Sequence, residues 1–548
     1  MHQRTPYTGT HRRLVVGIDV GTTFSGVSYA ILDPGVVPEI RGVNRFPAQG
    51  AVGADCKIPS VIYYDADGVP RAFGAETRQQ DIIEQAEDEN WTKAAWFKLH
   101  LQPRSMKSSS HSRPPLPRQK TAQDVFADFI AYLYRCAATY IQETHGDLLW
   151  LSIEKHIDFV LSHPNGWEGH QQKILRRAAV TAGLFTDDRD GHARLEFVTE
   201  GEASLNFCIS QGLTTAAMQN GQGVIIVDAG GGTVDISAYH IALKTWIFQE
   251  IASAQCLLQG STFVIQRAAS FLENTFKDFP FVGDVPPMVE IFDTATKLTF
   301  RSSTVPAYIK FGCVRNNDRN RDVRNGRLTI SGPRVEEFFK PSFDAIMDAI
   351  IAQKEEAKRK KPVAVLYLVE DLRSFGLAVS RPDTHVNKAV ADGAVSFYLD
   401  RFVKTRVAKI TYGVDCNIPY QSSIPDHKAR HRGVFVGLGG RPRLHHSFSV
   451  LLSRGTSVEE EKEFRRSYIN DSTCAADLNN IRCTVTGFHG EFRKVSGKKG
   501  TSHYVIDFDI ILTFGAPELK AQVCWKENVT VLTNSLPASG PATIVYDD

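Results

Sequence analysis

One pattern occurs twice in this chain, and the repetition constrains its fold more than any other feature. An apolar strand ends on an aspartate, a short turn rich in glycine and threonine follows, and a second apolar strand leads away. In the first copy, residues 14–20 (LVVGIDV) enter a turn formed by Gly21, Thr22 and Thr23, and residues 27–32 (VSYAIL) leave it. Two apolar runs joined by such a turn predict a β-hairpin.

The second copy lies near the middle of the chain. Residues 223–228 (GVIIVD) enter the turn 229–233 (AGGGT), and residues 234–239 (VDISAY) return. The repetition indicates a degenerate internal duplication. A single turn of this kind is as compatible with an ordinary loop as with a ligand site. Two turns at the ends of equivalent strands favour a shared function.

The composition of the two turns indicates a cleft that binds phosphate groups. Glycines allow the backbone N–H groups of a turn to approach an anion closely, and threonine hydroxyls add hydrogen-bond donors. Asp19 and Asp228 end the two strands and are predicted to face a magnesium ion through bound water, because Mg²⁺ gives up its water shell reluctantly. A P-loop is not indicated, since residues 497–499 (GKK) lack the preceding glycine spacing and the hydroxyl after the lysine.

Between the two copies, the sequence predicts both helices and strands. Apolar residues recur at helical spacing over residues 121–144, which predicts a long amphipathic helix. A buried strand is expected at residues 157–162, a helix over residues 168–183 and a short strand at residues 197–200. Residues 103–119 are rich in serine and proline and are expected to form a mobile surface loop.

The character of the sequence changes after residue 400, where short β-like runs alternate with glycine and charged turns. The expected strands are residues 448–452, 481–486, 504–513 and 519–525. A separate β-rich module at the C-terminus is the simplest account.

The composition limits the classes of partner. The 548 residues carry a formal net charge of +2, which gives no reason to expect nucleic acid or a membrane surface as a partner. The nine cysteines are scattered, never fall as C-x-x-C and are expected to be reduced core residues. We expect a cytoplasmic or nuclear protein, because residues 1–13 are polar and basic and no later stretch reaches the length of a membrane span.

Six strings of the sequence, taken in order, resemble one known family. They are GIDVGTTFS at 17–25, SHPNGW at 162–167, TEGEA at 199–203, DAGGGTVD at 228–235, GSTF at 260–263 and AVADGA at 389–394. Together they resemble the heat-shock protein 70 family, and most of all its divergent branch, which lacks the usual helical lid and is abundant in fungi. The likeness is specific over residues 14–398 and fainter beyond them.

This resemblance implies a duplicated actin-like (ribonuclease H-like) ATPase fold, an α/β architecture of two lobes with a nucleotide cleft between them. The implied division is a basic tail at residues 1–13, lobe I at residues 14–217, lobe II at residues 218–400 and a β-rich C-terminal module at residues 401–548. ATP and Mg²⁺ are the implied cofactors. The implied activity is slow ATP hydrolysis by a chaperone-like protein, with an unfolded or client protein as a further partner.

The resemblance also implies roles for individual residues. Lys98 is expected to position the attacking water, and Glu200 is expected to lie near the waters of a metal ion on the side of Asp19 and Asp228. Asp293 and Lys297 are expected to hold the adenosine. The residues expected around the phosphates are Gly21, Thr22, Thr23, Gly230, Gly231, Gly232 and Thr233.

One element of the family pattern is absent from the sequence. In the family, a strand of the second lobe leads into a Gly-Gly turn and a helix, which together hold the adenine and ribose. Here the corresponding strand, residues 363–369 (VAVLYLV), leads directly into residues 370–376 (EDLRSFG). Either the clamp is truncated or the gene model is misread. The later pair Gly439 and Gly440 is expected to be an ordinary turn.

Three functions therefore stay open at this point. The first is a chaperone-like protein that binds and slowly hydrolyses ATP. The second is a nucleotide-binding regulatory protein with little turnover, because of the truncated clamp. The third is a small-molecule kinase, which the string at 230–235 disfavours and for which no acceptor-side base stands out.

Overall fold

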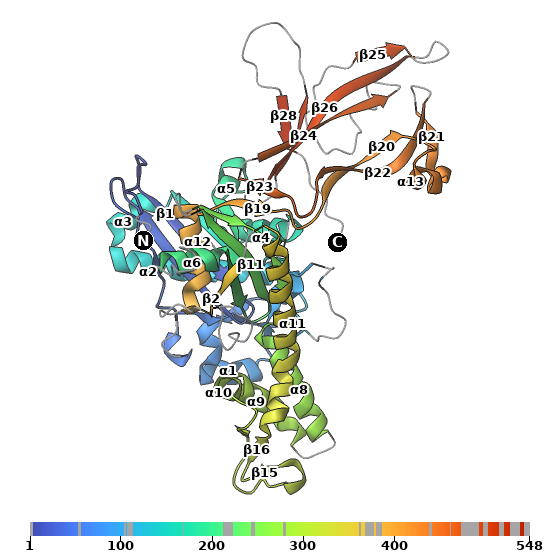
Figure 1. Cartoon of the computed structure of the whole chain (residues 1–548). Helices are drawn as coiled ribbons and strands as arrows, with labels where there is room; N and C mark the ends of the chain where they lie inside the picture. The colour runs from blue at the N-terminus through green and yellow to red at the C-terminus, as the bar shows by residue number, and fades with distance from the viewer. Residues whose placement is uncertain are drawn as a thin grey trace. The chain divides into compact units, whose positions relative to one another are not determined.

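The computed structural model divides the chain into two compact units, Met1–Phe402 and Val403–Asp547. Both are mixtures of helices and strands (Figure 1). The residues that the structure describes are 4–52, 56–103, 106, 113–167, 169–211, 223–242, 247–277, 281–360, 363–367, 378–379, 386–437, 441–460, 462–472, 493–496, 502–514, 520–525 and 538–541.

The first unit contains a sheet with the strand order β3–β2–β1–β8–β9, in which β4 also pairs with β2. The first predicted hairpin is β1 and β2, which run antiparallel with Asp19 opposite Gly26. Strands β8 and β9 continue the sheet in parallel with β1. The strand bounds are β1 (Arg13–Val20), β2 (Phe24–Leu32), β3 (Arg41–Gly42), β4 (Ile58–Pro59), β8 (Ile157–His163) and β9 (Leu195–Thr199).

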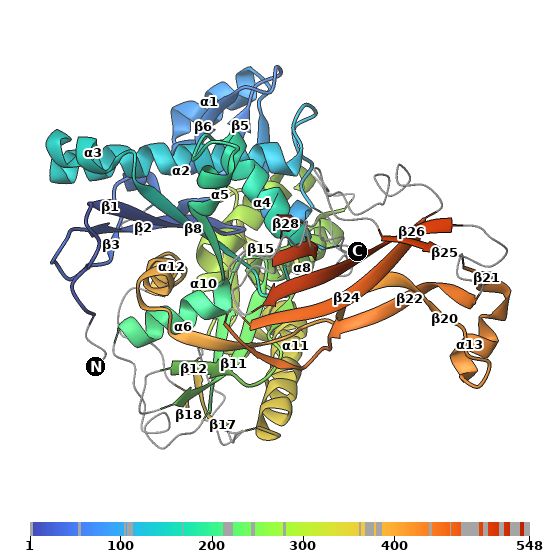
Figure 2. The same ribbon diagram turned by 90° about the horizontal axis from the view of Figure 1, so that it is seen from above.

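Alternate residues of β1 face two different cores, as the two-residue period of a strand requires. Leu14, Val16 and Ile18 belong to the core that contains the buried residues of α2 (Ala122–His145) and α4 (Gly169–Thr181). Val15 packs on the other side with α6 (Glu200–Ser210) and α12 (Ala389–Asp400). Figure 2 shows the sheet between these two layers.

A second sheet repeats the central arrangement of the first. Strand β10 is antiparallel to β11 and parallel to β17, just as β1 is antiparallel to β2 and parallel to β8. Ile225 and Ile236 of this sheet pack against Met347 and Ile350 of α11 (Gly332–Lys358). The remaining strands pair at its edges. The bounds are β10 (Gly223–Ala229), β11 (Val234–Ala242), β12 (Ile247–Glu250), β13 (Gln255–Leu257), β17 (Val363–Tyr367) and β18 (Ala378–Val379).

Two smaller groups of elements complete the first unit. One joins a three-stranded sheet of β5 (Val61–Tyr64), β6 (Pro70–Phe73) and β7 (Thr92–Ala95) to α1 (Gln80–Asp88). The other surrounds a core of Phe276, Met288 and Phe292. Its elements are α8 (Ser261–Phe276), α9 (Val285–Ile291), α10 (Lys297–Thr299), β14 (Ala307–Lys310), β15 (Val323–Arg324) and β16 (Arg327–Ile330). The short helices α3 (Asp147–Ile153) and α5 (Arg189–Ala193) flank the first sheet.

The described elements of the second unit are mostly strands. Strand β22 pairs with β20 and β21, and β26 pairs with β24, β25 and β27. The bounds are β19 (Val403–Val407), β20 (Tyr412–Pro419), β21 (Val434–Val436), β22 (Pro442–Leu452), β23 (Ser457–Glu459), β24 (Lys462–Ser472), β25 (Arg493–Ser496), β26 (Ser502–Phe514), β27 (Lys520–Trp525) and β28 (Ala538–Pro541), with one short helix, α13 (Pro425–Ala429).

Most predicted elements are present near their predicted positions. The long helix is α2, the buried strand is β8, and the helix expected at 168–183 is α4. The strand expected at 197–200 is β9, which ends at Thr199, so that Glu200 is the first residue of α6 rather than the end of a strand. The expected strand 481–486, the segment 370–376, Gly439 and Gly440 lie outside the described residues, as do residues 104–105 and 107–112 of the expected loop 103–119.

The described part of the expected basic N-terminal tail contacts other segments of the first unit. The N–H of Tyr7 donates to the oxygen of Val36 at 2.9 Å, and the N–H of Gly35 donates to the oxygen of Tyr7 at 2.8 Å. Arg4 forms an ion pair of 2.8 Å with Asp400 at the end of α12. Arg4 of this segment is therefore paired with a carboxylate that is distant in sequence.

Two further expectations concern cysteines and membranes. Six cysteines are free: Cys56, Cys136, Cys208, Cys256, Cys313 and Cys416. Cys208 is buried, but Cys313 is exposed, so the expectation of a core position is wrong there. None of the helices in the described part of the chain is long and apolar enough to cross a membrane.

Candidate functional site

The two predicted turns line one cavity of about 610 Å³ in the first unit. Each turn lies where a strand of the central pairs β1–β2 and β10–β11 reverses. Of the predicted site residues, only Asp293 is not part of the lining. The predicted residues that line the cavity are Asp19, Gly21, Thr22, Thr23, Lys98, Glu200, Asp228, Gly230, Gly231, Gly232, Thr233 and Lys297.

The two turns approach each other so closely that a side chain in the second turn would displace the threonine side chains of the first. A Cβ atom at Gly231 would lie 2.4 Å from Oγ1 of Thr23, and one at Gly232 would lie 2.3 Å from Oγ1 of Thr22. Distances this short do not occur between real atoms. The glycines therefore allow two backbone segments, far apart in sequence, to share one wall of the cavity.

The second turn presents backbone donors that a ligand can use. The carbonyl oxygens of Gly230, Gly231 and Gly232 accept hydrogen bonds from the N–H groups of residues 260–262 at the start of α8, over 2.8 to 3.2 Å. In a trans peptide the N–H points away from the preceding carbonyl. The N–H groups of residues 231–233 therefore point away from α8. Such a row of N–H groups is suited to bind an anion.

Asp19 is held from two sides. Its Oδ1 accepts a hydrogen bond from Oγ of Ser162 at 2.9 Å, and its Oδ2 lies 2.7 Å from Nζ of Lys57. Burial alone would raise the pKa of Asp19, but the ammonium groups of Lys57 and Lys98 outweigh burial, and the pKa falls below its ordinary value. Asp19 is therefore ionised at neutral pH.

Lys98 forms a buried ion pair with Glu200. It lies in a short 3₁₀ helix, Phe97–Leu101, and its Nζ is 2.5 Å from Oε1 of Glu200. Burial lowers the pKa of Lys98, but the charges of Glu200 and Asp19 more than compensate, and the pKa is raised. Lys98 therefore remains an ammonium group, able to donate hydrogen bonds but unable to accept a proton.

Asp228 lies in a different electrostatic environment from Asp19. Its Oδ2 accepts a hydrogen bond from Oγ of Ser204 at 2.9 Å. Burial, followed by repulsion from the charge of Glu200, raises the pKa of Asp228 to about 7. The two strand-end aspartates, equivalent in the sequence pattern, thus differ in protonation near neutral pH.

Asp235 and Asn165 form a buried polar connection behind the cavity. The backbone N–H of Asn165 donates to Oδ1 of Asp235 at 2.5 Å, and its side-chain amide donates to Oγ of Ser237 at 2.9 Å and to the oxygen of Gln255 at 3.2 Å. Burial and the charge of Glu200 raise the pKa of Asp235 well above its ordinary value. This connection joins the segment after β8 to strands β11 and β13.

Several of these residues were not among the predicted site residues. Asp235 and Asn165 belong to strings that carry the family resemblance, so closer attention to those strings could have identified them. Lys57 lies outside any such string and has no local signal. It was missed because its partner, Asp19, is distant in sequence.

The two residues expected at the adenosine differ in position. Lys297 lines the cavity. Asp293 lies one turn earlier, in a π-helical turn (Phe292–Thr296), and its Oδ1 is 2.5 Å from Nζ of Lys297. Asp293 therefore positions Lys297 rather than facing the cavity. Residues 368–377, where the family has its adenosine clamp, lie outside the described residues.

The oxygen donors of the cavity fit a magnesium ion that keeps its water shell. Asp19, Glu200 and Asp228 supply carboxylates, the donor type that Mg²⁺ prefers. Within the described ranges, no three or more His, Cys, Asp or Glu side chains are grouped closely enough to bind a metal ion directly. Contact through waters and phosphate oxygens is the arrangement that this donor set supports.

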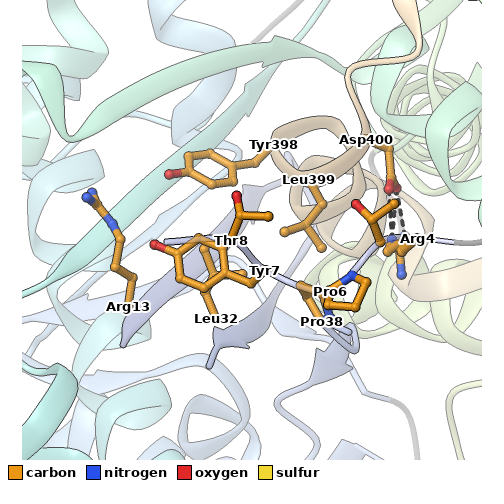
Figure 3. A pocket seen from close by; sticks show the side chains of 11 residues that line it. Arg4, Pro6, Tyr7, Thr8, Arg13, Leu32, Pro38, Tyr398, Leu399 and Asp400 are labelled. Atoms are coloured by element: carbon orange, nitrogen blue, oxygen red, sulfur yellow. Dashed lines mark hydrogen bonds and ion pairs between the residues drawn. The ribbon is translucent and has the colours of Figure 1, made fainter. Parts of the chain in front are cut away.

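A second cavity, of about 520 Å³, lies between the N-terminal segment and the end of α12 (Figure 3). Its charged groups are already paired. Arg4 binds Asp400, and Arg13 lies 2.5 Å from Asp158, which also accepts a hydrogen bond from the hydroxyl of Tyr398 at 2.7 Å. This balanced lining shows no preference for an anion, whereas the first cavity contains both glycine turns. The first cavity is therefore the candidate site.

Comparison with known proteins agrees with the sequence pattern. No protein-family model matches the chain. The chain is 22% identical over 497 residues to heat shock 70 kDa protein 12A of Mus musculus, a match that covers 73% of this chain and 72% of the relative. It is 22% identical over 494 residues to the Homo sapiens protein of the same name, with the same coverage. These matches, together with the strings quoted above, support the assignment of the chain as a divergent heat-shock protein 70-like member of the actin-like ATPase family.

Proposed function

We propose that the chain is a chaperone-like protein that binds ATP with magnesium in the cavity between the two glycine turns and hydrolyses it slowly. The observation that carries this proposal is the convergence of both turns, with the outward-facing N–H groups of residues 231–233, on one cavity that also contains the Lys98–Glu200 pair. In this proposal, the cavity lies between two equivalent lobes, each built on one of the two hairpins.

The phosphate side of the nucleotide is bound by both turns. The hydroxyls of Thr22, Thr23 and Thr233 and the N–H groups of the second turn donate hydrogen bonds to phosphate oxygens. A bound magnesium ion would neutralise part of the phosphate charge. Lys297 lines the same cavity and, in this proposal, contacts the nucleoside.

For hydrolysis, the oxygen of a water molecule bonds to the γ-phosphorus and the bond from phosphorus to the β-γ bridging oxygen breaks. Lys98 donates a hydrogen bond that fixes the position of the water, but an ammonium group cannot take its proton. Asp228 lines the same cavity with a pKa of about 7, so it is the carboxylate best matched to accept the proton near neutral pH. A water oriented by a cation is a weak nucleophile, which is consistent with slow turnover.

The first experiment measures thermal unfolding of the full chain with and without ATP, in buffers with and without magnesium. A ligand present at about 100 times its Kd stabilises the native state by about 2.7 kcal/mol. An unchanged unfolding midpoint at saturating ATP in both buffers would refute the proposal, because a ligand that binds the native state must stabilise it.

The second experiment separates turnover from binding. Phosphate release is measured for the wild type and for Asp228→Asn, which keeps the size of the side chain but cannot accept a proton. Slow release by the wild type that the variant loses supports hydrolysis. ATP binding without release identifies a nucleotide-binding regulatory protein, and phosphate transfer to a sugar or acid in a substrate screen identifies a small-molecule kinase.

The second unit is proposed to bind an unfolded or client protein. Its described strands supply sheets with edges, the element to which an extended peptide adds by backbone hydrogen bonding. Binding of a fluorescent unfolded peptide, compared in ATP and ADP, tests this part of the proposal. Equal absence of binding in both nucleotides would contradict it.

A further inference from the structure

One positively charged side chain at the cavity, that of Lys57, is not among the residues that the family resemblance implies. Three carboxylates and three lysines line it: Asp19, Glu200, Asp228, Lys57, Lys98 and Lys297. Lys98 is paired with Glu200 and Lys297 with Asp293. Lys57 is paired with Asp19, the carboxylate expected on the magnesium side.

The local fold fixes the position of Lys57 beside the first phosphate turn. The residues that follow it form β4, which pairs with the start of β2 so that Ser25 lies opposite Ile58. The N–H of Ser60 donates to the oxygen of Thr23 at 2.8 Å. The lysine stem runs along Gly26, where a Cβ atom would come within 3.3 Å of its Cγ. The ammonium group therefore reaches the cavity from a residue that directly precedes a paired strand.

The ammonium group of Lys57 has more N–H donors than its bond to Asp19 uses. Its Nζ lies 2.7 Å from Oδ2 of Asp19, and only 19% of the side chain is exposed to solvent. A lysine ammonium has three N–H donors, of which the bond to Asp19 uses one. The other donors are available to phosphate oxygens at the turn that contains Thr22 and Thr23.

A divalent cation at Asp19 would have to replace or adjoin this ammonium group. Both oxygens of Asp19 already have partners, Ser162 and Lys57. Lys57 therefore occupies the place next to Asp19 at which a cation would neutralise the phosphates. A divalent cation beside Lys57 is disfavoured by repulsion between the two positive charges. It is also less important for neutralising the phosphates, because Lys57 already supplies a positive charge there.

We propose that Lys57 is a built-in counter-ion that lets this cavity bind nucleoside triphosphate with little dependence on a divalent cation. The inference rests on the proposed function, because it concerns the same nucleotide. It makes the nucleotide polyphosphate itself a ligand of the cavity, in addition to the metal–nucleotide complex of the proposed function. The metal, when present, then affects turnover more than affinity.

The test measures the Kd of ATP by calorimetry in EDTA and in excess magnesium. The variants are Lys57→Gln, which keeps a donor without the charge, Lys57→Arg, which keeps the charge, and Lys340→Gln, a matched control at an exposed lysine. We expect the wild type, Lys57→Arg and Lys340→Gln to bind within about threefold in the two buffers. Lys57→Gln should bind about tenfold or more weakly in EDTA, because a hydrogen bond from a charged donor contributes on that scale.

A second readout does not use nucleotide. If Lys57 competes with a cation for Asp19, magnesium alone should raise the unfolding midpoint of Lys57→Gln more than that of the wild type. This comparison uses each variant as its own reference, so a general loss of stability does not affect it.

The failures of the two proposals can be told apart. ATP binding by the wild type in magnesium only, with Lys57→Gln unchanged, overturns the role of Lys57 and leaves the proposed function intact. An equal magnesium response of both proteins without nucleotide also overturns it. Absence of ATP binding in both buffers overturns the proposed function and this inference with it.

Discussion

Gly393 offers a direct test of how the two helices beside the cavity are held together. It lies in α12, and a Cβ atom at this position would be 1.9 Å from the backbone oxygen of Ala203 in α6 and 2.5 Å from the adjacent carbonyl carbon. Both contacts are to backbone, which cannot rotate away as a side-chain end can. The substitution Gly393→Ala therefore forces the two helices apart.

The magnitude follows from two opposing effects. Alanine favours a helix over glycine by about 1 kcal/mol. Overpacking a filled interior destabilises by roughly 1–3 kcal/mol, and a clash with backbone belongs at the upper end. We expect a net loss of about 2 kcal/mol in the free energy of unfolding. The separation should also weaken ATP binding, because α6 carries Glu200 and Ser204 and α12 carries Val390, all of which line the cavity.

The assay compares urea unfolding and ATP-dependent thermal stabilisation of the wild type, Gly393→Ala and Gly283→Ala. The control position has no atom within 4 Å of a Cβ built on it, so its substitution should be nearly neutral. If Gly393→Ala is as stable as the wild type, or gains the full helix-propensity increment, the close approach of α6 and α12 is refuted.

Three more predictions concern charged residues. The raised pKa of Asp228 means that, above its ordinary pKa, the native state holds a proton which the unfolded state has lost, so the stability falls as the pH rises from the ordinary value to about 7. Asp228→Asn should therefore be roughly 2 kcal/mol more stable than the wild type at pH 8 and close to it only below about pH 4, as thermal unfolding across this range would show. Lys98→Met should reduce phosphate release by roughly 100-fold, because the water is no longer positioned. It should also destabilise the apoprotein by about 3 kcal/mol, because Glu200 loses its partner. Unchanged phosphate release would contradict the role of Lys98 in positioning the water. Arg4→Ala should destabilise by about 2 kcal/mol in urea, because it leaves a buried Asp400, whereas Arg12→Ala, which breaks an exposed pair with Asp33, should change stability by less than about 1 kcal/mol.

The parts of the site that could be predicted from the sequence are those encoded by local patterns. The strand, the aspartate and the glycine turn adjoin one another in sequence, so both hairpins and the residues Gly21 and Gly230 could be placed before the structure was known. Glu200 belongs to a family string and Lys98 was implied by the family resemblance, and the structure brings the two together at 2.5 Å. Their roles in binding and turnover stay predictions.

The parts that could not be predicted depend on contacts between distant segments. Lys57 lies in a stretch with no motif, and only the pairing of β4 with β2 brings it to Asp19. Arg4 looked like part of a basic tail because its partner, Asp400, is almost the length of the unit away in sequence. Asp293 and Lys297 are four residues apart and form an ion pair, but only Lys297 lines the cavity.

Proton exchange at Asp228 reports whether a divalent cation accompanies the nucleotide. At neutral pH this carboxyl is only partly ionised, so any charge placed beside it changes how many protons it binds. Triphosphate bound without a metal brings negative charge, raises the pKa of Asp228 further and takes up a proton. Triphosphate bound with a divalent cation next to Asp228 lowers that pKa and releases a proton. Calorimetry of ATP binding at pH 7 in two buffers of different ionisation enthalpy measures whether protons are taken up or released. We expect proton uptake in EDTA and a smaller uptake, or a release, in magnesium. If the wild type exchanges no protons, or if Asp228→Asn exchanges the same number, Asp228 does not sense the bound phosphates.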